Sequence, residues 1–100
     1  MPKKLKKESP AEQIGVKITE KPRPSYTDQA RMFGTQGKIK IAVEFGADGK
    51  IHGIFPFQTL PNGLTENTVK VVEKVKFEPA TKDGKAISTI GIISYSFTIY

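Results

Sequence analysis

His52 is the only histidine in this chain of 100 residues, and the chain contains no cysteine. A zinc site needs further imidazole or thiolate ligands, and none is available to join His52. The lack of cysteine also excludes a disulfide framework and a cysteine nucleophile. His52 stands beside Gly53 in a short apolar segment, where we expect it to be exposed rather than a ligand. The sequence therefore predicts neither a bound metal nor a cofactor.

The acidic residues show no arrangement suited to acid–base catalysis. Glu44, Asp48 and Glu78 stand among lysines or at turns, and nothing places two carboxylates in one cleft. The GTQG segment that begins at Gly34 lacks the lysine and the serine or threonine that complete a phosphate-binding loop. No Gly-x-Ser-x-Gly segment is present to position a catalytic serine. We therefore expect that the protein is not an enzyme.

Positive charge could carry a different function. Sixteen lysine and arginine residues against ten aspartate and glutamate residues give a formal net charge of +6. This balance permits a polyanion partner, and Lys38, Lys40 and Lys50 would line one face of a hairpin to bind it. Most aromatic residues are expected to point inward, and there is no tryptophan, so stacking platforms for bases are missing. Nucleic acid is therefore disfavoured, and peptidoglycan is the stronger form of this alternative.

The hydrophobic pattern of the first half predicts the scaffold for these side chains. Residues 27–34 are typical of a short helix, capped by Thr27, with Phe33 on its buried face. Alternating apolar residues from Ile39 to Phe45, an Asp-Gly turn and a second strand then predict a β-hairpin. Gly53 indicates a bulge in the second strand, and Pro56 places that strand at an edge of the sheet.

The second half predicts one more helix and one more strand. Thr65 can cap a helix whose apolar stripe runs from Leu64 to Val75, with Phe77 closing its end against the core. An Asp-Gly turn leads into a last strand over about residues 86–100. Around Gly91 the apolar residues change parity, so either both faces of this strand are partly apolar or a bulge intervenes. The predicted fold class is α+β: a small antiparallel three-stranded sheet packed on two helices, in the order helix, hairpin, helix, strand.

The chain begins with a basic stretch that we assign to a different kind of structure. Residues 1–17 are rich in lysine, with prolines at positions 2 and 10, and are expected to be a flexible linker remnant. Alternation from Ile14 to Ile18 could still form a short strand. The folded domain is expected to comprise residues 18–100. The chain contains neither a secretory signal nor an apolar run long enough to span a membrane.

Several short motifs follow one another in a distinctive order. They begin with Pro24-Ser25-Tyr26 and continue through the Ile39–Phe45 strand and the DGKI segment that starts at Asp48. The FEPA segment from Phe77, the KDGK segment from Lys82 and a final alternating strand complete the series. In this order the motifs resemble the C-terminal domain of TonB-family energy transducers, and the resemblance covers about residues 18–100. The chain departs from the family at Thr27, where many members have a second proline, and in lacking the glutamine often found before Pro24.

The resemblance implies a periplasmic domain of a protein anchored in the inner membrane. In this family a motor complex driven by the proton-motive force acts on the transducer through its anchor, which is missing from this sequence. The C-terminal domain binds a short segment of an outer-membrane TonB-dependent transporter, and that segment adds a strand to the sheet. Pro24 and Tyr26 match the family's loop near the bound segment.

The last strand could supply the edge for such a segment. It carries no proline, and its outward side chains are small and polar, so a guest strand could pair with its backbone alone. The predicted partner-binding residues are Pro24, Tyr26, Ser94, Tyr95, Ser96, Phe97, Thr98 and Ile99. The same edge could join a second copy in a homodimer. Alternatively, the N-terminal segment covers this edge and the strand is an ordinary solvated one.

Overall fold

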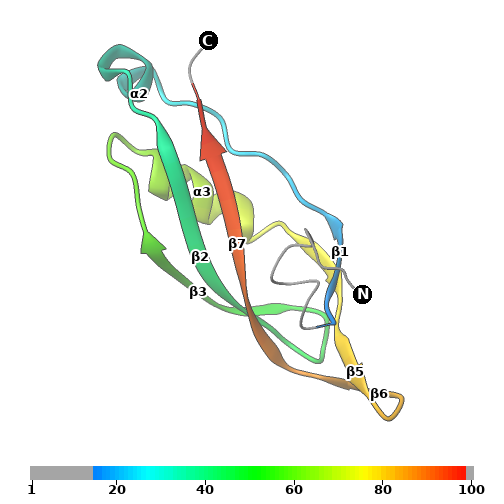
Figure 1. Cartoon of the computed structure of the whole chain (residues 1–100). Coiled ribbons are helices and arrows are strands. Elements are labelled where there is room, and N and C mark those ends of the chain that lie inside the picture. The colour runs from blue at the N-terminus through cyan, green and yellow to red at the C-terminus, as the bar shows by residue number, and fades with distance from the viewer. Residues whose placement is uncertain (1–14, 99–100) are drawn as a thin grey trace, which may run out of the picture.

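The structure is a computed structural model that describes residues 15–98 (Figure 1). The elements along the chain are β1 (Lys17–Glu20), α2 (Asp28–Phe33), β2 (Gly37–Phe45), β3 (Ile51–Gln58), α3 (Leu64–Val72), β4 (Lys76–Glu78), β5 (Ala80–Lys82), β6 (Lys85–Ile87) and β7 (Thr89–Phe97). Three strands form the main antiparallel sheet in the order β3-β2-β7. The predicted α+β fold with two helices is therefore confirmed.

The central strand β2 alternates strictly between the core and the opposite face of the sheet. Its odd-numbered residues from Ile39 to Phe45 are fully buried, whereas Lys38 and Lys40 point to the other face. The period of two in the sequence thus determines which face is buried, as expected for a half-buried strand. β7 continues the same pattern, with Ile93, Tyr95 and Phe97 buried.

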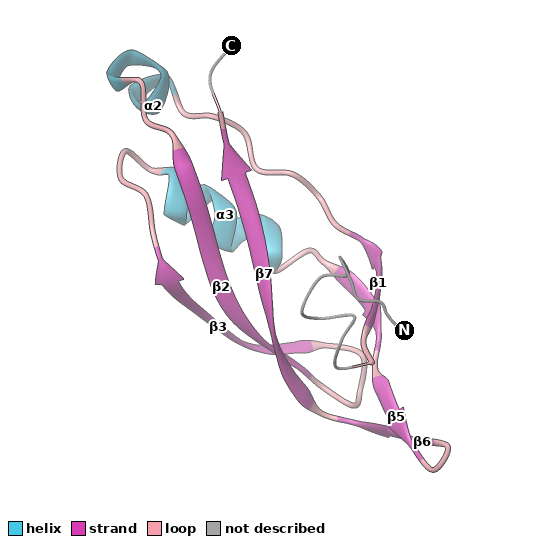
Figure 2. Cartoon of the chain, in the orientation of Figure 1, coloured by secondary structure: helices cyan, strands magenta, loops and turns pink. Residues whose placement is uncertain are grey.

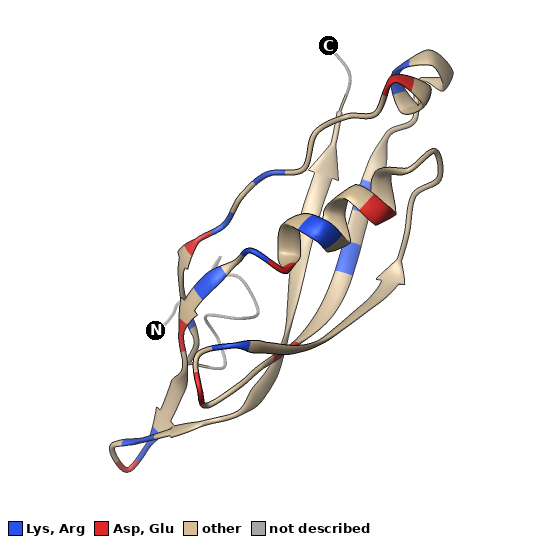
Figure 3. Ribbon diagram, turned by 180° about the vertical axis from the view of Figure 1, so that it is seen from behind, with Lys and Arg blue, Asp and Glu red and all other residues tan. Residues whose placement is uncertain are grey.

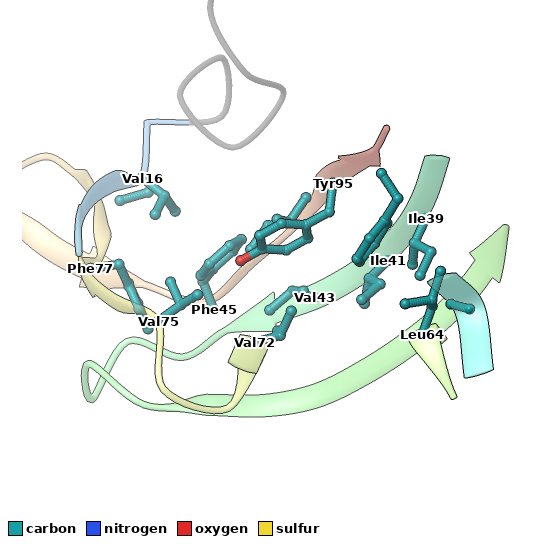
Figure 4. Close-up of a cluster of buried hydrophobic side chains, with 14 residues drawn as sticks. Val16, Ile39, Ile41, Val43, Phe45, Leu64, Val72, Val75, Phe77 and Tyr95 are labelled. Atoms are coloured by element: carbon teal, nitrogen blue, oxygen red, sulfur yellow. The ribbon is translucent and has the colours of Figure 1, made fainter. Parts of the chain in front are cut away.

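The core fills the space between this sheet face and α3 (Figure 4). Leu64, Thr68 and Val72 recur every four residues along α3 and are all buried. The hydroxyl of Thr68 donates to the carbonyl of Leu64 at 2.8 Å, which satisfies this fully buried polar side chain. The ring of Phe45 meets the ring of Phe77 edge to face at 4.9 Å.

The predicted end of the second helix was wrong. α3 stops at Val72, and Phe77 lies in β4, which pairs antiparallel with β1. Phe77 is nevertheless buried, as expected, but as the inward residue of a strand. The valine-rich sequence at this point has modest helix propensity, so pairing with β1 outweighs the local preference.

Pairing of β1 with β4 also moves the start of the folded part. Val16 is buried and Lys17 is the first residue of β1, although both were assigned to the linker. Of the alternation from Ile14 to Ile18, only Lys17 and Ile18 lie in β1, and Ile14 lies outside the described residues. A second small hairpin, β5–β6, turns at Asp83-Gly84, where both residues have positive φ. The single predicted last strand is thus divided into β6 and β7.

The two helix starts illustrate one confirmed and one wrong prediction. Thr27 caps α2 by accepting from the backbone amide of Ala30 at 3.0 Å. Phe33, however, is 67% exposed, because this six-residue helix buries only Ala30. α3 begins after Gly63, without a side-chain cap, and Thr65 instead bonds the backbone of Leu60 in the preceding loop.

Of the two strand irregularities considered from the sequence, one at Gly53 and one at Gly91, only the first is present. The β2–β3 register shifts between Glu44 and Phe45, next to Gly53, so the bulge in β3 is confirmed. The β2–β7 register runs without interruption past Gly91. The change of parity there therefore means that both faces of β7 are partly apolar, with Ile90 65% exposed.

Candidate functional site

β7 forms one edge of the main sheet. Within residues 15–98 it pairs only with β2, through nine consecutive residue pairs from Gly37–Phe97 to Phe45–Thr89. No strand of the described part lies on its other side. A continuous, proline-free edge of this kind carries unpaired backbone groups.

Two hydrogen bonds show which backbone groups of β7 face outward. The carbonyl of Lys38 accepts from the side-chain amide of Gln58, so the backbone of Lys38 faces β3. Ser96 stands opposite Lys38, and in an antiparallel pair the backbone of such a residue must face away from β2. The carbonyl of Ser94 agrees, because it accepts from the ammonium of Lys21 at 3.2 Å on the outer side. The backbone donors and acceptors of Ser94 and Ser96 therefore lie at the free edge.

The segment between β1 and α2 runs along this edge without joining the sheet (Figure 2). Pro22 and Pro24 keep it extended, because each fixes its own φ and neither can donate a backbone hydrogen bond. The hydroxyl of Tyr95 donates to the carbonyl of Pro22 at 3.1 Å and holds the segment against β7.

Tyr26 fixes the other end of the segment. Its hydroxyl donates to the carbonyl of Thr35 at 2.7 Å, and its ring meets Phe97 edge to face at 5.5 Å. The guanidinium of Arg31 lies 5.7 Å from the centre of the same ring. The segment is therefore held at both ends.

A groove of about 550 Å³ lies between this segment and β7. It is lined by Lys21, Arg23, Pro24, Tyr26, Ser94, Tyr95, Ser96, Phe97 and Thr98. Seven of the eight residues predicted for partner binding thus lie together. The eighth, Ile99, lies outside the described residues.

Lys21 and Arg23 also line the groove but were not predicted as site residues. Figure 3 shows only basic positions along this extended stretch, and no acidic residue among residues 15–98 lines the groove. The signal was present, because Pro22 and Pro24 impose an extended backbone in which residues 21 and 23 project to the same side. The groove is therefore a polar, positively charged channel with a backbone edge as one wall.

Two pKa shifts follow from burial in this groove. Desolvation lowers the pKa of Lys21 below its ordinary 10.5, and the nearby charge of Arg23 lowers it further. Its ammonium also lies 4.8 Å from the centre of the Tyr95 ring. Desolvation raises the pKa of Tyr95 to about 12, so its hydroxyl stays protonated and able to donate to Pro22.

The residues considered for metal binding or polyanion binding lie away from the groove. His52 is exposed, as expected, and its Nε2 contacts the Asp48 carboxylate at 2.9 Å across the β2–β3 turn. This side-chain hydrogen bond is the main reason that the pKa of Asp48 lies below its ordinary value. Lys38 and Lys40 lie on the open face of the sheet, away from the core.

The fold and groove together define a class: small α+β domains that present one unpaired sheet edge beside an extended segment. The family model described as Gram-negative bacterial TonB protein C-terminal matches residues 22–99, well over half of the chain, and the chain therefore belongs to this family. The resemblance seen in the sequence is confirmed.

A curated relative agrees with the family, and a solved structure agrees with the fold. The chain is 26% identical over 77 residues to Protein TonB of Pseudomonas aeruginosa, covering 76% of this chain and 22% of that protein. The chain thus spans about a fifth of the length of this relative. It also resembles the solution NMR structure of the Pseudomonas aeruginosa TonB CTD, with a TM-score of 0.66 and 23% identity over 85% of this chain and 87% of the other. Among the described residues, no helix has the length and apolar character needed to cross a membrane.

Proposed function

We propose that this chain is the partner-binding domain of a TonB-like energy transducer. It binds an extended segment of an outer-membrane transporter by strand addition at the free edge of β7. The observation that supports this most is the outward-facing backbone of Ser94 and Ser96 on one wall of the groove. Membership of the TonB C-terminal family makes a transporter the expected partner.

Membership of the family also supports the rest of the proposed arrangement. The domain works in the periplasm and is joined to an inner-membrane anchor, on which a motor complex acts. Its own role is binding and transmission of force rather than catalysis. Backbone pairing suits this role, because it places few demands on the sequence of the guest and lets one domain serve several transporters.

The groove indicates how a guest would enter. A strand beside β7 takes the amides and carbonyls of Ser94 and Ser96, each pairing being worth about 0.5–1.5 kcal/mol net. The ammonium of Lys21 holds the Ser94 carbonyl in the free protein, so the guest amide has to replace it. Pro24 and Tyr26 form the facing wall and limit the guest to an extended chain.

Amide chemical-shift mapping with short peptides from outer-membrane transporters tests the proposal. We expect the largest chemical-shift changes along Ser94–Phe97 and near Tyr26. The affinity for the peptide should depend little on ionic strength. Shifts confined to Lys38, Lys40 and Lys50, with binding that weakens steeply as salt is added, would instead indicate the polyanion alternative. A peptide of the same length and charge with proline at every second position is the control, because proline removes the amide donors that strand pairing needs.

A further inference from the structure

The open face of the main sheet carries apolar side chains that take no part in the proposed strand addition. This is the face opposite α3, and β2 and β7 lie in front of the helix in the view of Figure 1. The register places Phe55, Ala42 and Ile92 in one row across the three strands. Glu44 and Ile90 are neighbours in the next row. The face therefore carries a connected apolar patch around Ala42.

Two side chains of this patch are well exposed. Phe55 is 59% and Ile90 is 65% exposed, whereas Ala42 and Ile92 are half-buried. The ring of Phe55 occupies the space over Gly53, where an added Cβ would lie 2.6 Å from Phe55 Cε2. The absence of a side chain at Gly53 thus lets the Phe55 ring lie flat on the face of the sheet. A flat apolar surface results.

Charges flank the patch symmetrically on β2. Lys40 precedes Ala42 by two residues and Glu44 follows it by two, so all three point to the same face. Within residues 15–98 neither Lys40 nor Glu44 forms an ion pair. A second sheet turned end for end over Ala42 would bring each of these charges opposite its complement.

We propose that the open face binds a second copy of this chain, sheet to sheet. A two-fold axis that passes between the sheets at Ala42, perpendicular to the strands, places Ala42, Phe55 and Ile92 each opposite its own copy. The same axis places Lys40 of each chain opposite Glu44 of the other. Two stacked sheets in this arrangement lie about 10 Å apart, the usual spacing for face-to-face packing.

This dimer differs from an edge-to-edge dimer because it does not use the outer backbone of β7. Its contacts come from side chains on the face of β2, β3 and β7, whereas guest pairing uses the outer backbone of β7. The proposal therefore does not depend on the proposed transporter binding. The patch is much smaller than a standard interface of about 20–30 residues a side, so we expect a weak, concentration-dependent dimer.

Charge reversal and its repair test the proposal. Sedimentation equilibrium at rising protein concentration should show a dimer, with amide shifts at Ala42, Phe55 and Ile92 that depend on concentration. Lys40→Glu or Glu44→Lys alone should weaken it by about tenfold, because each change places two pairs of like charges together. The double variant Lys40→Glu/Glu44→Lys should restore it to within about threefold of the original.

Lys38→Glu is the matched control, since it makes the same charge change on the same face without a complementary partner. It should change the dimer affinity less than Lys40→Glu does. The proposal is overturned if the protein stays monomeric, or if the double variant is no tighter than the singles. Dimerisation that is lost in Ser96→Pro but unaffected by charge reversal also overturns it, because that result indicates pairing at the β7 edge.

Discussion

The two edges of the main sheet have opposite properties. β3 carries Pro56 and two register shifts, between Lys40 and Ile41 and between Glu44 and Phe45 of its partner strand. β7 is regular over nine residues and has no proline. The β3 edge is therefore permanently unsuited to pairing, whereas the β7 edge is suited to it.

The position of Pro56 strengthens the contrast. It stands opposite Ile41, whose backbone faces β7, so its ring nitrogen takes the outward position where an amide would donate. On β7 the equivalent outward positions are Ser94 and Ser96, which keep their amides. Within residues 15–98 the Ser94 carbonyl at this edge accepts a hydrogen bond from the Lys21 ammonium, which a guest can displace. A small domain can therefore protect one edge of its sheet permanently and the other edge reversibly.

The largest expected effect comes from making the β7 edge resemble the β3 edge. Ser96→Pro removes an outward amide and leaves a guest carbonyl unpaired, which costs about 1–3 kcal/mol. Affinity for a transporter peptide should fall roughly tenfold to a hundredfold, measured by calorimetry on a variant whose amide spectrum shows that it is folded. Ser96→Ala keeps the amide and should bind normally.

The converse change belongs to the same test. Pro56→Thr returns a donor to β3 but leaves both register shifts in place, so it should gain no peptide binding. Wild-type affinity in folded Ser96→Pro would show that β7 is not the pairing edge.

A smaller effect is expected from loosening the wall of the β7 groove. Tyr95→Phe removes the hydrogen bond to Pro22 and should lower the free energy of unfolding by about 0.5–1.5 kcal/mol. The pKa of Tyr95 rises from 10 in the unfolded chain to about 12 in the fold. The contribution of Tyr95 to the free energy of unfolding is therefore complete below pH 10. That contribution is lost between pH 10 and about 12.

Denaturant unfolding across this alkaline range measures the step, which Tyr95→Phe should lack. Lys21 titrates in the opposite sense, because its pKa is lowered in the fold. Both proteins are therefore compared in a Lys21→Met background. An unchanged alkaline step in Tyr95→Phe would mean that another group causes it.

The smallest effect concerns the reversible protection of β7. Lys21→Met frees the carbonyl of Ser94, so a neutral peptide should bind about two- to tenfold more tightly. Arg23→Met removes a neighbouring positive charge but leaves that hydrogen bond intact, and its effect should be smaller. Weaker binding by Lys21→Met would indicate that the ammonium contacts the guest rather than blocking it.

Much of this arrangement could be predicted where local rules act. Thr27 caps the start of α2 as expected, and Gly34, in the left-handed region at φ 66°, ends it. Pro56 correctly indicated an edge strand, and the alternation in β2 and β7 identified their buried faces. These features depend on one residue or on a period of two, which the sequence displays directly.

Prediction was wrong where distant segments compete with local preference. Residues that follow α3 form β4 because β1 lies beside them, although almost sixty positions separate the two strands in the chain. Phe33 is exposed because the six-residue helix α2 buries only Ala30 against the core. Neither outcome follows from propensity, since both depend on where other elements pack.

The alternation of buried and exposed residues, the protected β3 edge and the family of this chain could be predicted from its residues alone. The contacts of Lys21 and Pro22 with Ser94 and Tyr95, 73 positions further along the chain, are known only from the fold. Hydrophobic periodicity fixes which side chains are buried, whereas the neighbours of a sheet edge depend on how the whole chain packs.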